Sequence, residues 1–417
     1  MSISPGTSLC VRWEPVPDRS PITAFVRRFR GVCLGIGLSL AACRAPSPTP
    51  ESPAMTWVSI PATDARVRYV GRTYRASAGV VFSHPGVTVR ARFKGDAVRM
   101  RLDDAGLGGD VGTNHFDVIV DGAPPKLLAV HPGQATYLLA SDLPQGLHTV
   151  EITKRTESLV GASTLLALEV HGELQEPPRQ HTGLRMEFVG DSITCGYGTD
   201  VSLIPTSASW SAPTFTSKHQ NPRRSYGWLT ARQLGAEATF VCYSGHGVYR
   251  NLDLSTSGLI PAIYERAVPD HPAAWDSSHD SPDVIVLNAG TNDTFAGGGT
   301  PAFLPDEAAF TSAYRTFLER LRTLHPRAHI ICTLGSMTDG YKRMEQQGVV
   351  KSAHVGDWIT SLVAERQRQG DTRVYRHVMA MQNPFADGVG EDWHPSAATH
   401  QKMAESLSRF IQDAVHP

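Results

Sequence analysis

The sequence has almost no net charge, few cysteines and no long apolar run. Its 417 residues contain 39 Lys and Arg against 40 Asp and Glu, a formal net charge of −1. Without a basic surplus the chain has nothing to neutralise a polyphosphate backbone, so nucleic acid is excluded as an expected partner. No cysteine or histidine cluster has metal-ligand spacing, so we expect no metal site and no cofactor.

Cysteine is rare in the body of the chain. Three of the six cysteines lie at or before residue 43, which leaves Cys195, Cys242 and Cys332. An odd number argues against a disulfide framework. Cys242 and Cys332 sit in apolar, strand-like runs, so we expect buried free thiols.

The apolar run at residues 31–40 is too short to span a bilayer but has the length of a signal-peptide core. A basic stretch at 27–30 precedes it, and the Leu-Ala-Ala-Cys sequence that ends at Cys43 resembles a bacterial lipobox. We therefore expect a lipoprotein-type signal peptide at 1–43, removed to leave a lipidated Cys43, and a Pro-rich tether at 44–55. The protein would be exported and held at a membrane by that lipid alone. An ordinary signal peptide with an incidental cysteine is the alternative.

Two regions with different hydrophobic periodicity follow. Residues 56–175 show short alternating apolar and polar runs split by Gly, Pro and Asp turns, which predicts an all-β jelly-roll or sandwich domain. After a linker at 176–183, apolar runs that read as strands buried on both faces alternate with amphipathic helices. Residues 184–417 are therefore predicted to form a three-layer α/β domain with a parallel sheet.

Four candidate functional residues stand at junctions, three after predicted strands and one before a predicted helix. Ser192 follows the first strand of the α/β domain, Gly245 the second and Asn292 the third, and His394 precedes the last helix. Each has an ordinary structural explanation alone: a helix N-cap, a turn glycine, an Asx turn and a capping histidine. Together, and in this order, they favour nucleophilic catalysis, because functional groups gather beyond the carboxyl ends of parallel strands.

The segments that carry these residues resemble the conserved blocks of the SGNH hydrolases, which have a flavodoxin-like α/β fold. The resemblance is narrower to carbohydrate esterase family 2, the acetylxylan esterase-like group. It rests on residues 188–198, 244–251 and 392–404, and on Lys-Arg-Thr-Glu at 154–157, which is similar to the end of that family's N-terminal jelly roll. It covers residue 56 to the end of the chain.

The resemblance implies a serine esterase that removes O-acetyl groups from polysaccharides or sugars, such as acetylxylan or acetyl-glucomannan. Ser192 would be the nucleophile and His394 the base. The oxyanion hole would be formed by the Ser192 N–H, the Gly245 N–H and the Asn292 side chain. The partner would be an acetylated carbohydrate, and the oligomeric state is left open.

The residue that orients His394 is less defined. SGNH enzymes commonly use the acid three residues before the histidine, here Glu391. Family 2 has an Asp two residues before, here Asp392, and some members are thought to use a backbone carbonyl instead. The residue before Pro395 tends to be extended, and residues two apart in an extended chain point the same way, which favours Asp392. We therefore expect Asp392→Asn to lower kcat more than Glu391→Gln.

Sugar binding needs aromatic faces, and Trp393 and Tyr249 stand next to catalytic motifs, with Tyr197 a weaker candidate. The alternative is that they pack between helix and loop. Two rival functions also stay open: a general short-chain or lipase-like esterase on the same fold, and a non-catalytic carbohydrate-binding lipoprotein.

Overall fold

The computed structural model describes residues 56–176, 183–206, 211–277, 281–295, 304–338 and 355–415. The expected signal peptide at 1–43, the tether at 44–55 and Cys43 lie outside these residues. Within the described part of the chain, no helix combines the length and the apolar character that a membrane span requires.

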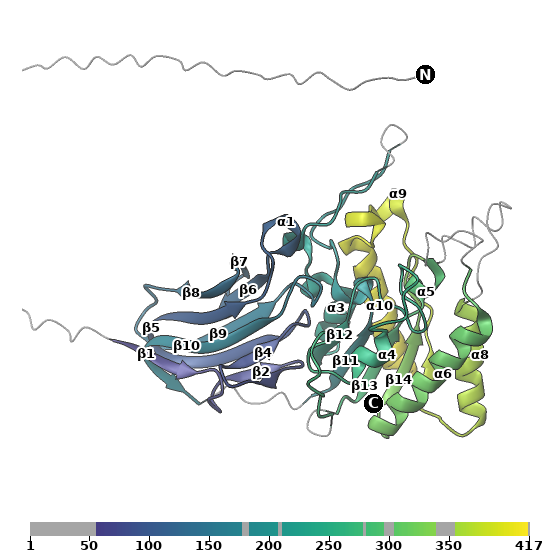
Figure 1. Cartoon of the computed structure of the whole chain (residues 1–417), viewed down its shortest axis with the longest axis horizontal. Helices are drawn as coiled ribbons and strands as arrows, with labels where there is room; N and C mark the ends of the chain where they lie inside the picture. Colours follow the sequence, from purple (N-terminus) through teal and green to yellow (C-terminus); the bar gives the residue numbers. More distant parts are fainter. Residues whose placement is uncertain are drawn as a thin grey trace, which may run out of the picture. The chain divides into compact units, whose positions relative to one another are not determined.

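An antiparallel β domain comes first (Figure 1). Its strand order is β3-β4-β10-β5-β9-β6-β7, with β1 paired to β10 and with β2 and β8 paired to β5. The strands are β1 (Trp57–Pro61), β2 (Arg68–Val70), β3 (Tyr74–Arg75), β4 (Val80–Phe82), β5 (Thr88–Asp104), β6 (His115–Val120), β7 (Lys126–Ala129), β8 (Gly133–Ala140), β9 (Gly146–Lys154) and β10 (Ser163–Gln175); α1 (Gly109–Gly112) is one helical turn.

The alternation in the sequence explains the core of this domain. Along β5, Val89, Ala91 and Phe93 are buried, whereas Arg90 and Arg92 between them are partly exposed. Such alternation puts one face of the sheet against the apolar core. This core also takes in residues of β4, β9 and β10.

A parallel α/β domain follows, with strand order β12-β11-β13-β14-β15, the flavodoxin-like order. Its strands are β11 (Arg185–Gly190), β12 (Glu237–Cys242), β13 (Val284–Asn288), β14 (His329–Thr333) and β15 (Val374–Arg376). Its helices are α2 (Ser192–Cys195), α3 (Tyr226–Gln233), α4 (Ile260–Tyr264), α5 (Thr291–Phe295), α6 (Glu307–Leu324), α8 (Val355–Arg368), α9 (Pro384–Asp387) and α10 (Ala397–Ala414), with 3-10 turns η1 (Ser217–His219), η2 (Pro222–Arg224) and η5 (Glu391–Trp393).

The parallel sheet is buried on both faces, as its continuous apolar runs predict. Val189 and Leu287 belong to the core shared with α6 and α8, while Phe188 and Val286 belong to the core shared with α3 and α10. Figure 1 shows α6 and α8 together at the β14 side of the domain. The predicted fold class, an all-β domain followed by a parallel α/β domain, is therefore confirmed.

Buried contacts, one polar and one apolar, join the two domains. The Arg72 guanidinium of the β domain donates to the Glu187 carboxylate of β11 at 2.8 Å, and both side chains are buried. Gly86 packs so closely on Phe240 that a Cβ there would lie 2.6 Å from the ring. The β domain is thus packed against the strands that lead into the polar junctions described next.

Candidate active site

Three of the expected site segments start at neighbouring strand ends. β11 lies between β12 and β13, and Gly190 at its end is in register with Cys242 of β12 and Asn288 of β13. The chain leaves these strands toward Ser192, Gly245 and Asn292. Since all three strands are parallel, the segments emerge at one edge of the sheet, at the point where the strand order reverses.

Ser192 is the first residue of α2. The Asp191 side chain caps the helix by accepting from the Ile193 N–H at 3.0 Å. Gly190 permits the tight strand-to-helix turn, because a Cβ there would lie 2.4 Å from the Asn288 carbonyl oxygen. The N–H groups of a first helical turn have no partner within the helix, so the Ser192 N–H can bind a negative charge.

The base expected from the sequence meets this hydroxyl. His394 Nε2 lies 2.7 Å from Ser192 Oγ, and His394 Nδ1 lies 3.0 Å from the Glu391 backbone carbonyl oxygen. A carbonyl only accepts, so Nδ1 carries the proton and Nε2 offers its lone pair to the hydroxyl. Burial lowers the pKa of His394, and the Glu391 carbonyl and the Asp392 charge oppose that shift. The imidazole is therefore kept neutral and ready to accept a proton.

Of the three groups proposed to orient His394, the Glu391 backbone carbonyl contacts the ring in this structure, and the favoured Asp392 carboxylate does not. The Asp392 carboxylate accepts from the Tyr197 hydroxyl at 2.7 Å and from the Phe215 N–H at 3.2 Å. The Glu391 carboxylate instead holds Thr216, accepting from its N–H at 3.0 Å and from its hydroxyl at 2.7 Å. Neither carboxylate bonds to the His394 imidazole. The backbone carbonyl oxygen of Glu391 does.

The backbone of η5 explains this outcome. His394 is extended before Pro395, as expected, but Asp392 and Trp393 both have left-handed backbones, with φ of 46° and 66°. Two left-handed residues in succession turn the chain back, so that the Glu391 carbonyl faces both the N–H and the ring of His394. Non-glycine residues rarely adopt this conformation, and it clusters at functional sites.

Tyr197 has a larger place in the site than the sequence indicated. Its ring stacks on His394 with ring centres 4.1 Å apart, and on Phe215 at 4.4 Å. Asp392 fixes the Tyr197 hydroxyl and thereby acts on His394 through the tyrosine ring. Nothing in the local sequence marks this stack, because Tyr197 and Asp392 are 195 positions apart.

The segments that hold Gly245 and Asn292 are tied together. Gly245 has a φ of 81°, and a Cβ at this position would meet nothing within 4 Å. Asn292 Nδ2 donates to the His246 carbonyl oxygen at 2.8 Å. The buried Asp293 carboxylate accepts hydrogen bonds from backbone N–H groups of the loop after Gly245, which are those of Val248, Tyr249 and Arg250. The sequence had not indicated this role for Asp293.

The two expected substrate contacts differ. Trp393 is partly exposed beside His394, and its carbonyl oxygen accepts from the Gln382 side chain at 3.0 Å. The Tyr249 ring packs edge-on against Phe310, and its hydroxyl accepts from the Asp306 N–H at 3.0 Å. These contacts favour the packing role for Tyr249, and substrate contact stays a prediction for both residues.

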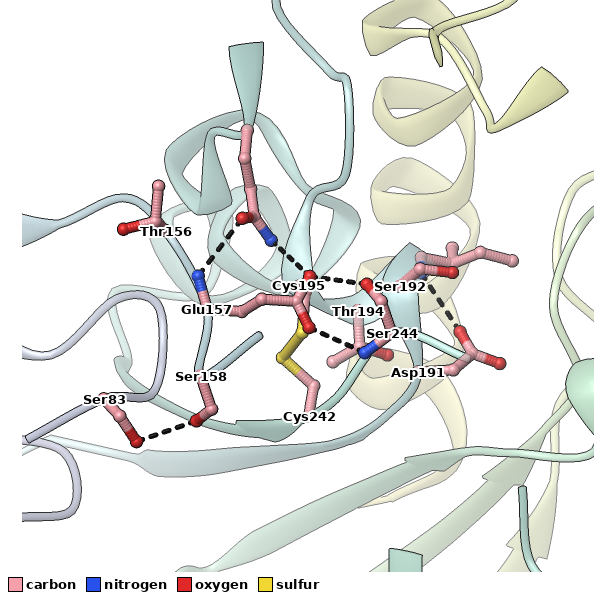
Figure 2. The surroundings of a disulfide bond; sticks show 12 residues. Ser83, Thr156, Glu157, Ser158, Asp191, Ser192, Thr194, Cys195, Cys242 and Ser244 are labelled. Carbon is pink, nitrogen blue, oxygen red and sulfur yellow. Dashed lines mark hydrogen bonds between the residues drawn. A yellow bond between two sulfur atoms is a disulfide. The ribbon is translucent and has the colours of Figure 1, made fainter. Parts of the chain in front are cut away.

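The cysteines correct a second expectation. Cys195 and Cys242 form a disulfide with their Cα atoms 5.7 Å apart (Figure 2). Cys332 is a buried free thiol, as expected. The pairing follows from the fold: Cys242 ends β12, Cys195 ends α2, and β11 brings them together. The bond links the Ser192 helix to the strand that leads into the Gly245 loop. Among the described residues, no group of acidic, histidine and cysteine side chains could hold a metal ion.

Comparisons with known proteins agree with the two-domain fold. Residues 69–178 match the model for the carbohydrate esterase 2 N-terminal domain, and residues 188–402 match the GDSL-like lipase/acylhydrolase family. A solved family two carbohydrate esterase from Clostridium thermocellum, in complex with cellohexaose, is 32% identical with a TM-score of 0.72. That match covers 83% of this chain and 98% of the other.

Two curated relatives are similar over most of this chain. A cellulase/esterase of Acetivibrio thermocellus, CelE, is 36% identical over 306 residues, which are 72% of this chain and 34% of the relative. This chain therefore spans about a third of the length of that protein. An acetylxylan esterase/glucomannan deacetylase of Cellvibrio japonicus is 29% identical over 84% of this chain and 89% of the relative.

Proposed function

The chain belongs to carbohydrate esterase family 2, and from this premise we propose that it removes O-acetyl groups from polysaccharides or sugars through an acetyl-enzyme on Ser192. The observation that carries the proposal is the 2.7 Å contact between Ser192 Oγ and His394 Nε2, with the far ring nitrogen bonded to the Glu391 carbonyl. This arrangement activates a serine without an acidic third member.

The chemistry follows from these atoms. His394 Nε2 takes the hydroxyl proton as Ser192 Oγ attacks the acetyl carbonyl carbon, and the carbonyl oxygen becomes an oxyanion. The N–H groups of Ser192 and Gly245 would stabilise this charge, together with Asn292. Asn292 Nδ2 has two hydrogens, and its bond to the His246 carbonyl leaves the second for the oxyanion.

Collapse of the tetrahedral intermediate expels the sugar alkoxide, which takes the proton from His394. A water molecule, deprotonated by the same imidazole, then attacks the acetyl-enzyme. Acetate leaves, and the proton returns to Ser192 Oγ. The neutral imidazole that burial favours is the form that both attacks require.

The acetylated carbohydrate substrate is supported by the relatives, one of which carries the name acetylxylan esterase/glucomannan deacetylase. The decisive experiment measures acetate release from a panel of acetylxylan, acetyl-glucomannan and simple acetyl sugars, with Ser192→Ala as the control. Release by the wild type alone supports the proposal. Faster cleavage of 4-nitrophenyl octanoate than of the acetate ester would favour a lipase-like esterase, and no turnover of either would favour a binding protein.

We also propose that the protein is exported and anchored by a lipid on Cys43, with residues 44–55 as the tether. The Leu-Ala-Ala-Cys sequence supports this location. Mass spectrometry of the natively expressed N-terminus should find diacylglyceryl-Cys43, and a soluble product cleaved at another position would contradict the anchor.

A further inference from the structure

One acidic side chain of the β domain reaches the loop that contains Gly245. Glu157 lies in the segment after β9 and is fully buried. Its carboxylate accepts from the Ser244 N–H at 2.6 Å and contacts the Ser244 hydroxyl at 2.5 Å (Figure 2). The Gln220 amide donates to the same carboxylate at 2.8 Å. A buried carboxylate thus spans the domain boundary and ends on the residue directly before Gly245.

The segment around Glu157 is itself held rigidly. The buried Lys154 ammonium donates to the Asn114 side chain at 2.8 Å and to the Thr156 carbonyl at 2.6 Å. The Glu157 N–H donates to the Gln220 side-chain oxygen at 3.1 Å, so Gln220 bonds to both ends of this residue. A side chain fixed in this way can impose a position on what it binds.

Ser244 is held at two atoms by one carboxylate. Bonds to its N–H and to its hydroxyl restrict both its backbone and its side-chain torsion. The next peptide unit carries the Gly245 N–H. Because Gly245 has no Cβ, its backbone torsions are less restricted than those of other residues, and contacts of neighbouring residues must restrict them. The direction of this N–H therefore depends on how firmly Ser244 is held. An oxyanion donor is effective only when it is aimed before the charge develops.

We propose that Glu157 is a positioning residue of the oxyanion hole, supplied by the β domain to the catalytic site of the α/β domain. The inference rests on the proposed function, because it requires Gly245 to donate to the oxyanion. It gives the β domain a direct part in catalysis through Ser244, separate from any binding of polymer.

The two acceptor oxygens of Glu157 matter as well as its shape. The carboxylate receives donors at both oxygens, all from Ser244 and Gln220. A glutamine at this position has one amide NH2, which must face either the Ser244 N–H or the Gln220 NH2. Two donors would then oppose each other in a buried place, which is unfavourable. Glu157→Gln should therefore disturb the loop although it preserves the volume.

The test compares Glu157→Ala and Glu157→Gln with Ser158→Ala in steady-state hydrolysis of 4-nitrophenyl acetate. Ser158 is the next residue and is also buried, and its hydroxyl bonds to Ser83 Oγ of the β domain at 2.7 Å. We expect kcat to fall about 10- to 100-fold in both Glu157 variants, with KM within about twofold, because a misaimed donor weakens transition-state binding. Ser158→Ala should retain kcat within about twofold.

A double-mutant cycle with Ser244→Ala separates positioning from folding. If Glu157 acts through Ser244, the losses in kcat for Glu157→Gln and Ser244→Ala should add only in part, because Ser244→Ala removes the hydroxyl contact and leaves the N–H contact. Additive losses, a rise in KM alone, or an equal fall in kcat for Ser158→Ala would overturn the inference. If Glu157→Ala does not fold, Glu157→Gln decides the outcome. Ser192→Ala is measured in parallel: activity retained there would refute the serine mechanism itself, whereas Glu157 variants with normal kcat would refute only the positioning role.

Discussion

The two halves of the site are built in different ways. Ser192, Gly245 and Asn292 stand at the ends of three adjacent parallel strands, and the Cys195–Cys242 disulfide crosslinks two of their segments. His394 stands in a short irregular turn. Its ring is held by one backbone carbonyl, by the stacked Tyr197 ring and by the nucleophile itself.

The difference shows that in this protein the regular strand-to-helix structure positions Ser192, whereas His394 is positioned by specific contacts of its ring. The register of the parallel strands places the starts of the segments that carry Ser192, Gly245 and Asn292 at one edge of the sheet. The turn at Asp392 and Trp393 instead stores an unusual backbone conformation that neighbouring groups must maintain. Variants should therefore fall into three groups: those that remove a reacting or stabilising group, those that loosen the strand ends, and those that alter the position or the pKa of His394.

The largest expected effect is the loss of the nucleophile. Ser192→Ala should lower acetyl-ester turnover by at least about 1,000-fold while the urea unfolding curve stays close to that of the wild type. The hydroxyl is required for the acetyl-enzyme, but its removal leaves the strand ends in place. Steady-state kinetics and urea unfolding together check this, and a variant that keeps most of its activity would refute the serine mechanism.

The next effect concerns the strand-end half alone. The paired cysteines are 47 positions apart, so a variant with Cys195→Ala and Cys242→Ala should lose about 4 kcal/mol of unfolding free energy through the greater entropy of its unfolded chain. Urea unfolding with and without dithiothreitol measures this, with the wild type sensitive to the reductant and the variant insensitive. Unchanged stability would mean that the disulfide does not form in solution.

Asn292→Ala tests the oxyanion-stabilising role of one residue at the strand ends. It should reduce kcat by about 100- to 1,000-fold and leave KM nearly unchanged, because the bond to the oxyanion strengthens in the transition state. The variant also loses the bond to the His246 carbonyl, so its melting temperature must be measured alongside. A change confined to KM would assign Asn292 to ground-state binding.

The smallest effect is expected at the base. Because neither carboxylate bonds to the imidazole, Asp392→Asn and Glu391→Gln should each lower kcat by less than about tenfold. The Asp392 charge raises the pKa of His394, so Asp392→Asn should lower that pKa further. Activity is lost as pH falls through this pKa, so the acid limb of kcat/KM should move to lower pH. A loss above about 100-fold would restore an acid as the orienting group, and a limb that moves to higher pH would contradict the effect assigned to the Asp392 charge.

The sequence by itself determined the fold class and indicated the segments of the candidate site. Alternating runs marked the β domain, continuous apolar runs marked strands buried on both faces, and the helices that end at Leu324 and Ala414 follow apolar faces visible in the sequence. These features depend on local periodicity, which a single chain displays directly. Ser192 and His394 were predicted from the junctions at which they stand and from the resemblance of their segments to the SGNH blocks, and the structure places Ser192 Oγ 2.7 Å from His394 Nε2.

Only the tertiary structure decided which groups meet across long separations. The left-handed turn at Asp392 and Trp393 places a backbone carbonyl, and not an acidic side chain, against the His394 ring. Asp392 in this turn bonds to Tyr197 and Phe215, which are far away in the chain. The Cys195–Cys242 bond and the contact between Glu157 and Ser244 likewise join segments that no local pattern relates. Periodicity shows which face of an element is buried, but the partner on that face is set by how the strands and the two domains pack.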